Sequence, residues 1–160
     1  MSAKPASRQP TPEAQLKSFL DRFDPKVQRL FRSVRAALRK RFPTANELAY
    51  DYSDSVVISY SPTDRGFEGI VAIAARADGV RLYLTHGLQL PDAKKLLLGS
   101  GKQARFVPVE VASRLAHPDV AALIAAAVDQ ASVALPSKGK GSLIIRSGGT
   151  EKRPRRKPKK

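Results

Sequence analysis

Four short β-type segments joined by short connections constrain the fold of this chain more than any other feature. They are rich in β-branched and aromatic residues and cover residues 47–52, 55–60, 69–76 and 80–85. The connections are too short for crossovers, so consecutive strands must run antiparallel. Between the last two strands, Asp78-Gly79 predicts a tight hairpin turn, because glycine readily adopts a positive φ. A further strand is predicted for residues 104–111, and Pro108 favours an edge position for it.

Helical periodicity flanks this meander on both sides. A first helix begins after Thr11 and places Leu16, Phe19, Leu20 and Phe23 on one face. A second helix starts at Pro25 and ends at Phe42, because proline at position 43 restricts the residue before it. Helices are also predicted for residues 91–98 and 118–134. The sequence therefore predicts an α+β fold, an antiparallel β-meander sheet with N-terminal and C-terminal helices packed on one face.

Composition divides the 160 residues into three parts. Residues 1–10 are predicted to be a flexible N-terminal arm, and residues 11–136 the α+β domain. Residues 137–160 are predicted to be a disordered basic tail, because they contain too few apolar residues to offset the entropy of ordering. Within it, the apolar residues 143–145 either dock on the domain or only interrupt the tail. The chain has no cysteine, and its start has no apolar core of a secretory signal. Its longest apolar run is too short to cross a bilayer, so we expect a cytoplasmic protein.

Charge is the extreme feature of the composition. Lys and Arg number 29 against 14 acidic residues, a net charge of +15, and the tail from residue 138 holds ten basic residues against Glu151. Such a balance favours a polyanionic partner: nucleic acid, an anionic membrane surface or an acidic protein. We expect non-specific, salt-sensitive nucleic-acid binding by the tail; a solubilising tail, or an electrostatic contact with a membrane or the ribosome, is the alternative. The candidate contacts are Arg153, Arg155, Arg156, Lys157, Lys159 and Lys160.

The second predicted helix adds a second basic element. Residues 25–41 contain seven basic residues and no acidic one. Ion pairs within the helix are therefore impossible, and the charges repel unless a polyanion or another segment neutralises them. Arg32, Arg35 and Arg39 are the candidate nucleic-acid contacts on this helix. A merely solvated polar face is the alternative.

No pattern of residues indicates catalysis, a metal or a cofactor. The sequence has no Gly-x-Ser-x-Gly nucleophile motif, and Gly99 to Lys102 does not match a phosphate-binding loop at the flanking positions. His86 and His117 lie outside any ligand-spaced cluster, and His117, just before Pro118, is predicted to cap a helix. The chain is therefore expected not to be an enzyme, with a binding function more compatible with its residues.

A ligand or anion site on the sheet is the alternative to a nucleic-acid surface. Its candidate residues are Lys102, Arg105, His86, Tyr50 and Tyr60. Tyr50 and Tyr52 share one face of a strand by parity. If that face is open, aromatic rings beside Arg81 could stack on bases; if helices cover it, the rings belong to the core.

The chain resembles the DUF1801 (YdhG-like) family of small bacterial proteins over residues 16–134. The resemblance lies in PKVQRLFRSVRAALRKRFPTANEL before the meander and in LLLGSGKQARFVPVE before the last helix. It implies a frataxin-like arrangement, with terminal helices on an antiparallel sheet, and no settled biochemical function. Some members of the family are labelled iron chaperones, so the resemblance also implies a small-molecule or metal-handling domain as an alternative.

Overall fold

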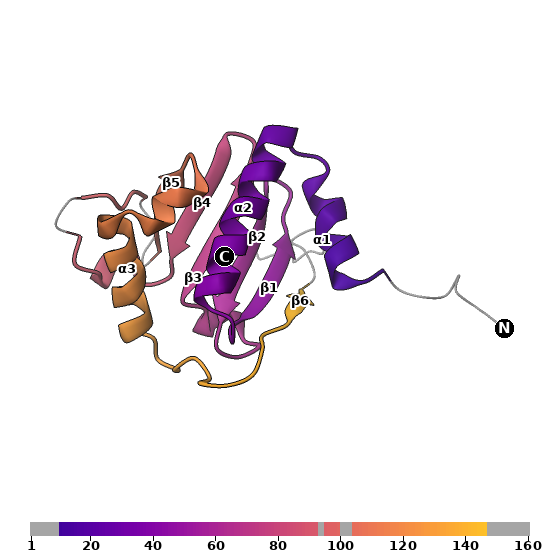
Figure 1. Cartoon of the computed structure of the whole chain (residues 1–160). Helices are drawn as coiled ribbons and strands as arrows, with labels where there is room; N and C mark the ends of the chain where they lie inside the picture. Colours follow the sequence, from indigo (N-terminus) through magenta and orange to yellow (C-terminus); the bar gives the residue numbers. More distant parts are fainter. Residues whose placement is uncertain (1–9, 93–94, 100–103, 147–160) are drawn as a thin grey trace, which may run out of the picture.

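Six strands form one open sheet in the order β5-β4-β3-β2-β1-β6 (Figure 1). A computed structural model describes residues 10–92, 95–99 and 104–146. Four strands pair antiparallel in sequence order, which confirms the predicted meander: β1 (Asn46–Asp51), β2 (Ser55–Ser61), β3 (Val71–Arg76) and β4 (Gly79–Leu84). The strand β5 (Arg105–Val109) pairs antiparallel with β4 and ends the sheet on that side, as Pro108 predicted.

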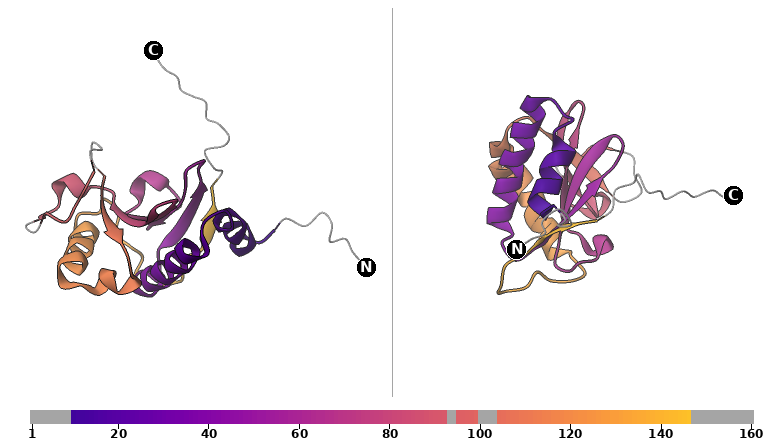
Figure 2. Two further views of the ribbon diagram at one scale, coloured as in Figure 1. Left: turned by 90° about the horizontal axis from the view of Figure 1, so that it is seen from above. Right: turned by 90° about the vertical axis from the view of Figure 1, so that its right-hand side faces the viewer.

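The three α-helices of the described residues lie on the same side of this sheet, and the views from above and from the side agree on this arrangement (Figure 2). They are α1 (Pro12–Leu20), α2 (Pro25–Arg41) and α3 (Pro118–Asp129). The helix α2 packs on the central strands β3 and β4. The opposite face of the sheet carries no α-helix among the residues described, so most of it is open.

Each α-helix begins with the same local device, a capping side chain followed by proline in the first turn. Thr11 Oγ1 accepts from Ala14 N at 3.1 Å, and Asp24 Oδ1 accepts from Lys26 N at 2.8 Å. His117 Nδ1 accepts from Asp119 N at 3.2 Å, which confirms its predicted capping role. Capping satisfies backbone donors that have no partner within the helix, and proline lacks a donor there.

Alternation along the strands builds the core on the helix side. The register aligns five buried residues across five strands: Ala49, Ile58, Ile73, Leu82 and Val107. The helix α2 covers this face with Phe31, Val34 and Leu38, which are completely buried. Burying each of these three side chains stabilises the folded state by about 1.5–3 kcal/mol. The helix α2 is therefore the main cover of the sheet.

A sixth strand lies within the segment that the sequence placed in the basic tail. The strand β6 (Leu143–Ile145) pairs parallel with β1, and Arg146 N donates to Ala49 O at 2.8 Å. Gly141 makes the approach possible, because a Cβ there would lie 1.6 Å from the carbonyl oxygen of Ala45. The sheet is therefore mixed rather than purely antiparallel, and ordered structure extends beyond residue 136.

The helix predicted for residues 91–98 is wrong for the part of that segment that is described. The Asp92 carboxylate accepts from Leu96 N at 2.8 Å and Leu97 N at 2.9 Å, which holds a turn instead. Leu98 then forms an isolated antiparallel bridge with Phe106 on the edge strand β5. Backbone pairing with a strand edge therefore outweighs the weak local helical pattern. The helix α3 is also shorter than predicted, since it ends at Asp129.

Candidate nucleic-acid interface

The basic residues of α2 fall into two groups with different surroundings. Arg35 and Arg39 lie on the flank of the helix that faces β1. The exposed remainder turns to solvent and comprises Lys26, Arg29, Arg32, Lys40 and Arg41. The two groups therefore have separate roles, although the sequence pattern predicted a single basic face.

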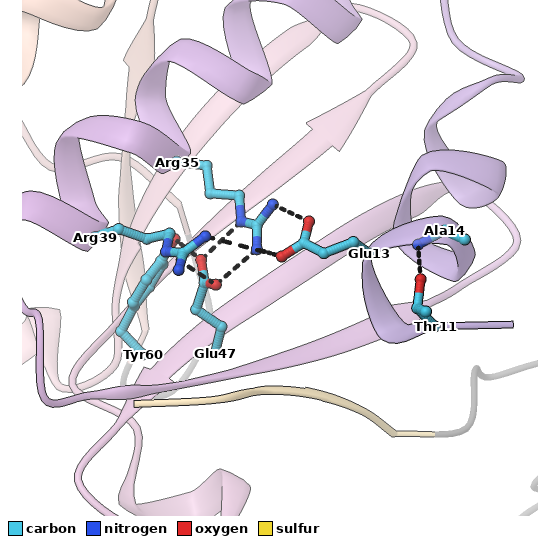
Figure 3. A network of polar contacts seen from close by, with 7 residues as sticks. All are labelled: Thr11, Glu13, Ala14, Arg35, Arg39, Glu47 and Tyr60. Carbon is cyan, nitrogen blue, oxygen red and sulfur yellow. Dashed lines mark hydrogen bonds and ion pairs between the residues drawn. The ribbon is translucent and has the colours of Figure 1, made fainter. Parts of the chain in front are cut away.

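Arg35 is the centre of a buried polar network (Figure 3). Its Nε and Nη2 atoms donate to the two carboxylate oxygens of Glu47, each at 2.8 Å. The Tyr60 hydroxyl donates to Glu47 Oε2 at 2.7 Å. The side chains of Arg35 and Glu47 are only 13% and 5% exposed. Glu47 therefore forms a bidentate salt bridge with Arg35 and accepts a further hydrogen bond from the Tyr60 hydroxyl.

Glu13, from the first turn of α1, completes the pairing on the solvent side. Its carboxylate accepts from Arg35 Nη1 at 2.9 Å and Nη2 at 2.8 Å (Figure 3). Arg39 lies within 3.8 Å of Glu13 and within 3.7 Å of Glu47. Two carboxylates thus oppose two guanidinium groups, and charges from α1 and β1 neutralise the inner side of α2.

The ionisation of the network follows from this geometry. Burial alone lowers the pKa of Arg35, but its hydrogen bonds to Glu13 and Glu47 outweigh burial and raise it. The hydrogen bond from Arg35 lowers the pKa of Glu13. Burial, followed by the negative charge of Glu47, raises the pKa of Tyr60 well above its ordinary value. Near neutral pH the network therefore holds a charged Arg35 and a neutral Tyr60.

The outward cations of α2 are in a different state. Within the described ranges, none of these five residues (Lys26, Arg29, Arg32, Lys40 and Arg41) forms an ion pair with a carboxylate. Arg32 donates a hydrogen bond to the amide oxygen of Gln28 at 3.3 Å. The Arg41 guanidinium lies 5.6 Å from the centre of the Phe42 ring. These residues are the part of the helix that can meet an external anion. Of the three contacts predicted from sequence, Arg32 and Arg39 are exposed, and Arg35 is committed to the network.

The six basic residues predicted as tail contacts lie outside the described residues, as does Lys102. They are Arg153, Arg155, Arg156, Lys157, Lys159 and Lys160. Their contribution to the interface thus rests on their charge in the sequence.

The structure disperses the ligand site that the sequence grouped together. Tyr60 is 1% exposed beneath the helices, whereas Tyr50 lies on the open face of the sheet, as the register of β1 and β2 requires. His86 precedes the short 3-10 turn η3 (Gly87–Gln89), and Arg105 begins β5 beside Gly87. Tyr50 and Tyr60 therefore cannot serve one pocket, while His86 and Arg105 lie near each other.

The hollow that includes His86 is small. It is bounded by Ile70, Leu90 and Ala127 among others, and its volume of about 10 Å³ is no more than one water requires. Among the residues described, no group of three or more His, Asp or Glu could hold a metal ion.

A larger cleft of about 290 Å³ adjoins the network. Arg39, Glu47 and Lys140 contribute its polar side chains, and Phe42 and Ala45 its apolar part. Glu47 already accepts hydrogen bonds from Arg35 and Tyr60, so Arg39 and Lys140 are the cations of the lining that can meet a bound anion.

Aromatic residues gather on the open face of the sheet. The rings of Tyr50 and Tyr52 stack with centroids 5.8 Å apart and planes within 3°. Tyr83 and Phe106 form a second pair, with centroids 5.4 Å apart. The parity of Tyr50 and Tyr52 was readable from the sequence, whereas the contribution of Phe106 required the register between β4 and β5.

Comparisons with known proteins do not add an identity. No family model matches the chain, and neither a curated protein nor a solved structure matches it significantly. None of the described helices is long and apolar enough to cross a membrane.

Proposed function

We propose that this chain binds nucleic acid without sequence specificity, through the outward face of α2 and the basic tail. The division of the cations on α2 is the observation that carries the proposal. Glu13 and Glu47 neutralise Arg35 and Arg39, but the outward cations have no carboxylate partner within the described residues. A phosphate backbone relieves their mutual repulsion and releases its own counterions on binding.

The proposal assigns different roles to the sequence-predicted contacts. Arg32 contacts phosphate together with Arg29 and Lys40, and Arg39 lies at the border of this surface. Arg35 is excluded, because reaching a phosphate would break its paired hydrogen bonds to Glu47. The tail supplies further charge, and the expected cytoplasmic location gives access to RNA and DNA.

We further propose that the domain is related to the DUF1801 (YdhG-like) family and its frataxin-like arrangement. Two helices, a four-stranded meander, an edge strand and a last helix follow one another in the order that the resemblance implies. The parallel strand β6 is an addition to that arrangement. The relationship leaves a small-molecule or metal-handling role as the competing function.

Salt titration of binding to a short DNA duplex and to single-stranded RNA tests the proposal. A triple variant, Arg29→Gln, Arg32→Gln and Lys40→Gln, removes three outward charges from α2. The matched control, Lys17→Gln, Arg65→Gln and Lys95→Gln, removes three exposed charges outside α2 and the tail. A third variant replaces the six tail cations with glutamine in the full-length chain, since truncation at residue 136 would delete β6.

The expected results separate the two basic elements. For the duplex, the α2 variant reduces the slope of log K against log salt by about 2 to 3, because each lost phosphate contact removes about 0.9. The tail variant reduces the slope by up to about 5, and the control leaves it nearly unchanged. Absence of binding by the unmodified chain at low salt would contradict the proposal and favour a ligand screen at the cleft beside Arg39.

A further inference from the structure

We propose that the open face of the sheet binds unpaired bases, so that the preferred partner is single-stranded nucleic acid. This inference rests on the proposed nucleic-acid function and names its substrate class. It assigns a second surface, on the side of the sheet away from α2. The helix and the tail would bind the phosphates, and the open face of the sheet would bind the bases.

The strand register gives this face two aromatic walls and a floor of small residues. Tyr50 and Tyr52 form the wall on β1, and Tyr83 with Phe106 forms the wall on β4 and β5. The floor between them consists of Val57, Ser59, Ala72 and Ala74. Because β1 and β4 are three strand spacings apart, the walls are separated by about 14 Å.

A short turn closes one end of this space. The 3-10 turn η2 (Gly66–Glu68) presents Phe67, whose residue surface is 75% exposed. Gly66 lets the turn lie against the sheet, since a Cβ there would be 2.5 Å from the Tyr50 hydroxyl. The resulting depression has a volume of about 500 Å³ and is lined by Tyr52, Phe67 and Tyr83 among others. Three rings from separate segments therefore border one open hollow.

Two arginines lie on this face, each within ion-pair distance of an aspartate in a hairpin turn. The Arg81 guanidinium lies 4.2 Å from the centre of the Phe106 ring and donates to the Tyr83 hydroxyl at 3.1 Å. Arg76 lies on the same face, one strand away. Within the described strands, the positions on this face include no Asp or Glu; Asp54 and Asp78 lie in the hairpin turns, 3.7–3.9 Å from these arginines.

This combination distinguishes a single strand from other occupants. Bases stack on exposed aromatic rings whatever their sequence, while arginine meets the backbone phosphates. A paired duplex buries its base faces in its own stack and cannot use the rings. A second copy of this chain would bring arginines against arginines at the net charge of +15. The net charge of the chain therefore favours the nucleic acid over a second copy.

Two exposed rings provide the test. A double variant, Tyr52→Ala and Phe67→Ala, removes apolar surface that is 36% and 75% exposed, so the fold is retained. The matched control is Val111→Ala, which truncates another exposed apolar residue, 56% exposed. Val111 precedes the 3-10 turn η4 (Ala112–Ala116), which packs against α2. Affinity is measured for a 12-nucleotide thymine strand and a 12-base-pair duplex over a salt series, with the mass of each protein from ultracentrifugation.

We expect the double variant to bind the thymine strand about tenfold or more weakly, with an unchanged salt slope and with duplex affinity preserved. Val111→Ala should match the unmodified chain. Equal affinity of the double variant and the unmodified chain for the thymine strand overturns the inference, while duplex binding leaves the proposed function in place. A dimer that the double variant converts to monomer, with thymine affinity unchanged, also overturns it and assigns the face to a second copy.

Discussion

The two faces of the sheet show how one set of strands supports two chemistries. On the helix side, Tyr60 is 1% exposed and its hydroxyl is bound to Glu47. On the open side, Tyr50 stacks on Tyr52 at the border of an open hollow. The difference lies in the cover. Under α2, a polar group must be paired to be tolerated, whereas on the open face an aromatic ring can remain exposed to solvent.

The helix α2 repeats this contrast at its own scale. Arg32 and Arg35 are one turn apart, yet the first is exposed and the second is enclosed by Glu13 and Glu47. Two arginines on neighbouring turns of one helix thus differ in their surroundings, since one faces solvent and the other is part of a buried ion-pair network. Charge counted along the sequence overstates the charge offered to a partner, because part of it is neutralised inside the fold.

Removing the inner arginine should have the largest effect on stability. Arg35→Gln removes both hydrogen bonds from Arg35 to the buried Glu47 carboxylate and leaves only Arg39, 3.7 Å away, as a cation, and we expect a loss of about 3–5 kcal/mol in the free energy of unfolding. Arg32→Gln, one turn away, should change it by less than about 0.5 kcal/mol. Urea denaturation of both variants at neutral pH measures the difference. Similar losses in the two variants would erase the contrast between the two sides of α2.

Removing one hydroxyl from each face sharpens the comparison between tyrosines. Tyr60→Phe deletes a hydrogen bond to a buried carboxylate, and we expect a loss of about 1.5–3 kcal/mol. Tyr50→Phe retains the stacked ring on the open face and should cost less than about 0.5 kcal/mol. Thermal and urea unfolding supply the measurement. A Tyr50 variant as destabilised as the Tyr60 variant would show that the open face is part of the core.

The smallest expected effects appear in the pH dependence of stability. The raised pKa of Tyr60 favours folding below pH 10, and this contribution is lost as the pH rises above that value. The lowered pKa of Glu13 favours folding above pH 4.5 and is lost as the pH falls below it. The stability difference between unmodified protein and Tyr60→Phe should therefore shrink at alkaline pH. The stability difference between the unmodified protein and Glu13→Gln should vanish at acidic pH. A stability difference that does not change with pH, for either variant, would contradict the pKa shift assigned to that residue.

The sequence alone predicted the elements whose signals are local. Helix starts at Thr11, Asp24 and His117 follow from a capping side chain beside proline, and the meander follows from alternation and short turns. It failed for residues 91–98 and did not predict strand β6, where pairing with a distant strand decides the conformation. Such pairing depends on which edge is available, and that information is absent from a local window.

For the candidate surfaces, composition and parity determined that basic charge and tyrosines were present, and that Tyr50 and Tyr52 share a face. Only the tertiary structure decided which of them remain accessible. It brought Glu13 and Glu47, 34 positions apart in the sequence, onto Arg35, and it placed Phe67 and Phe106 on the face of Tyr50 and Tyr83. Pairing of charges and covering of faces are contacts between distant segments, so they exist only after the chain has folded.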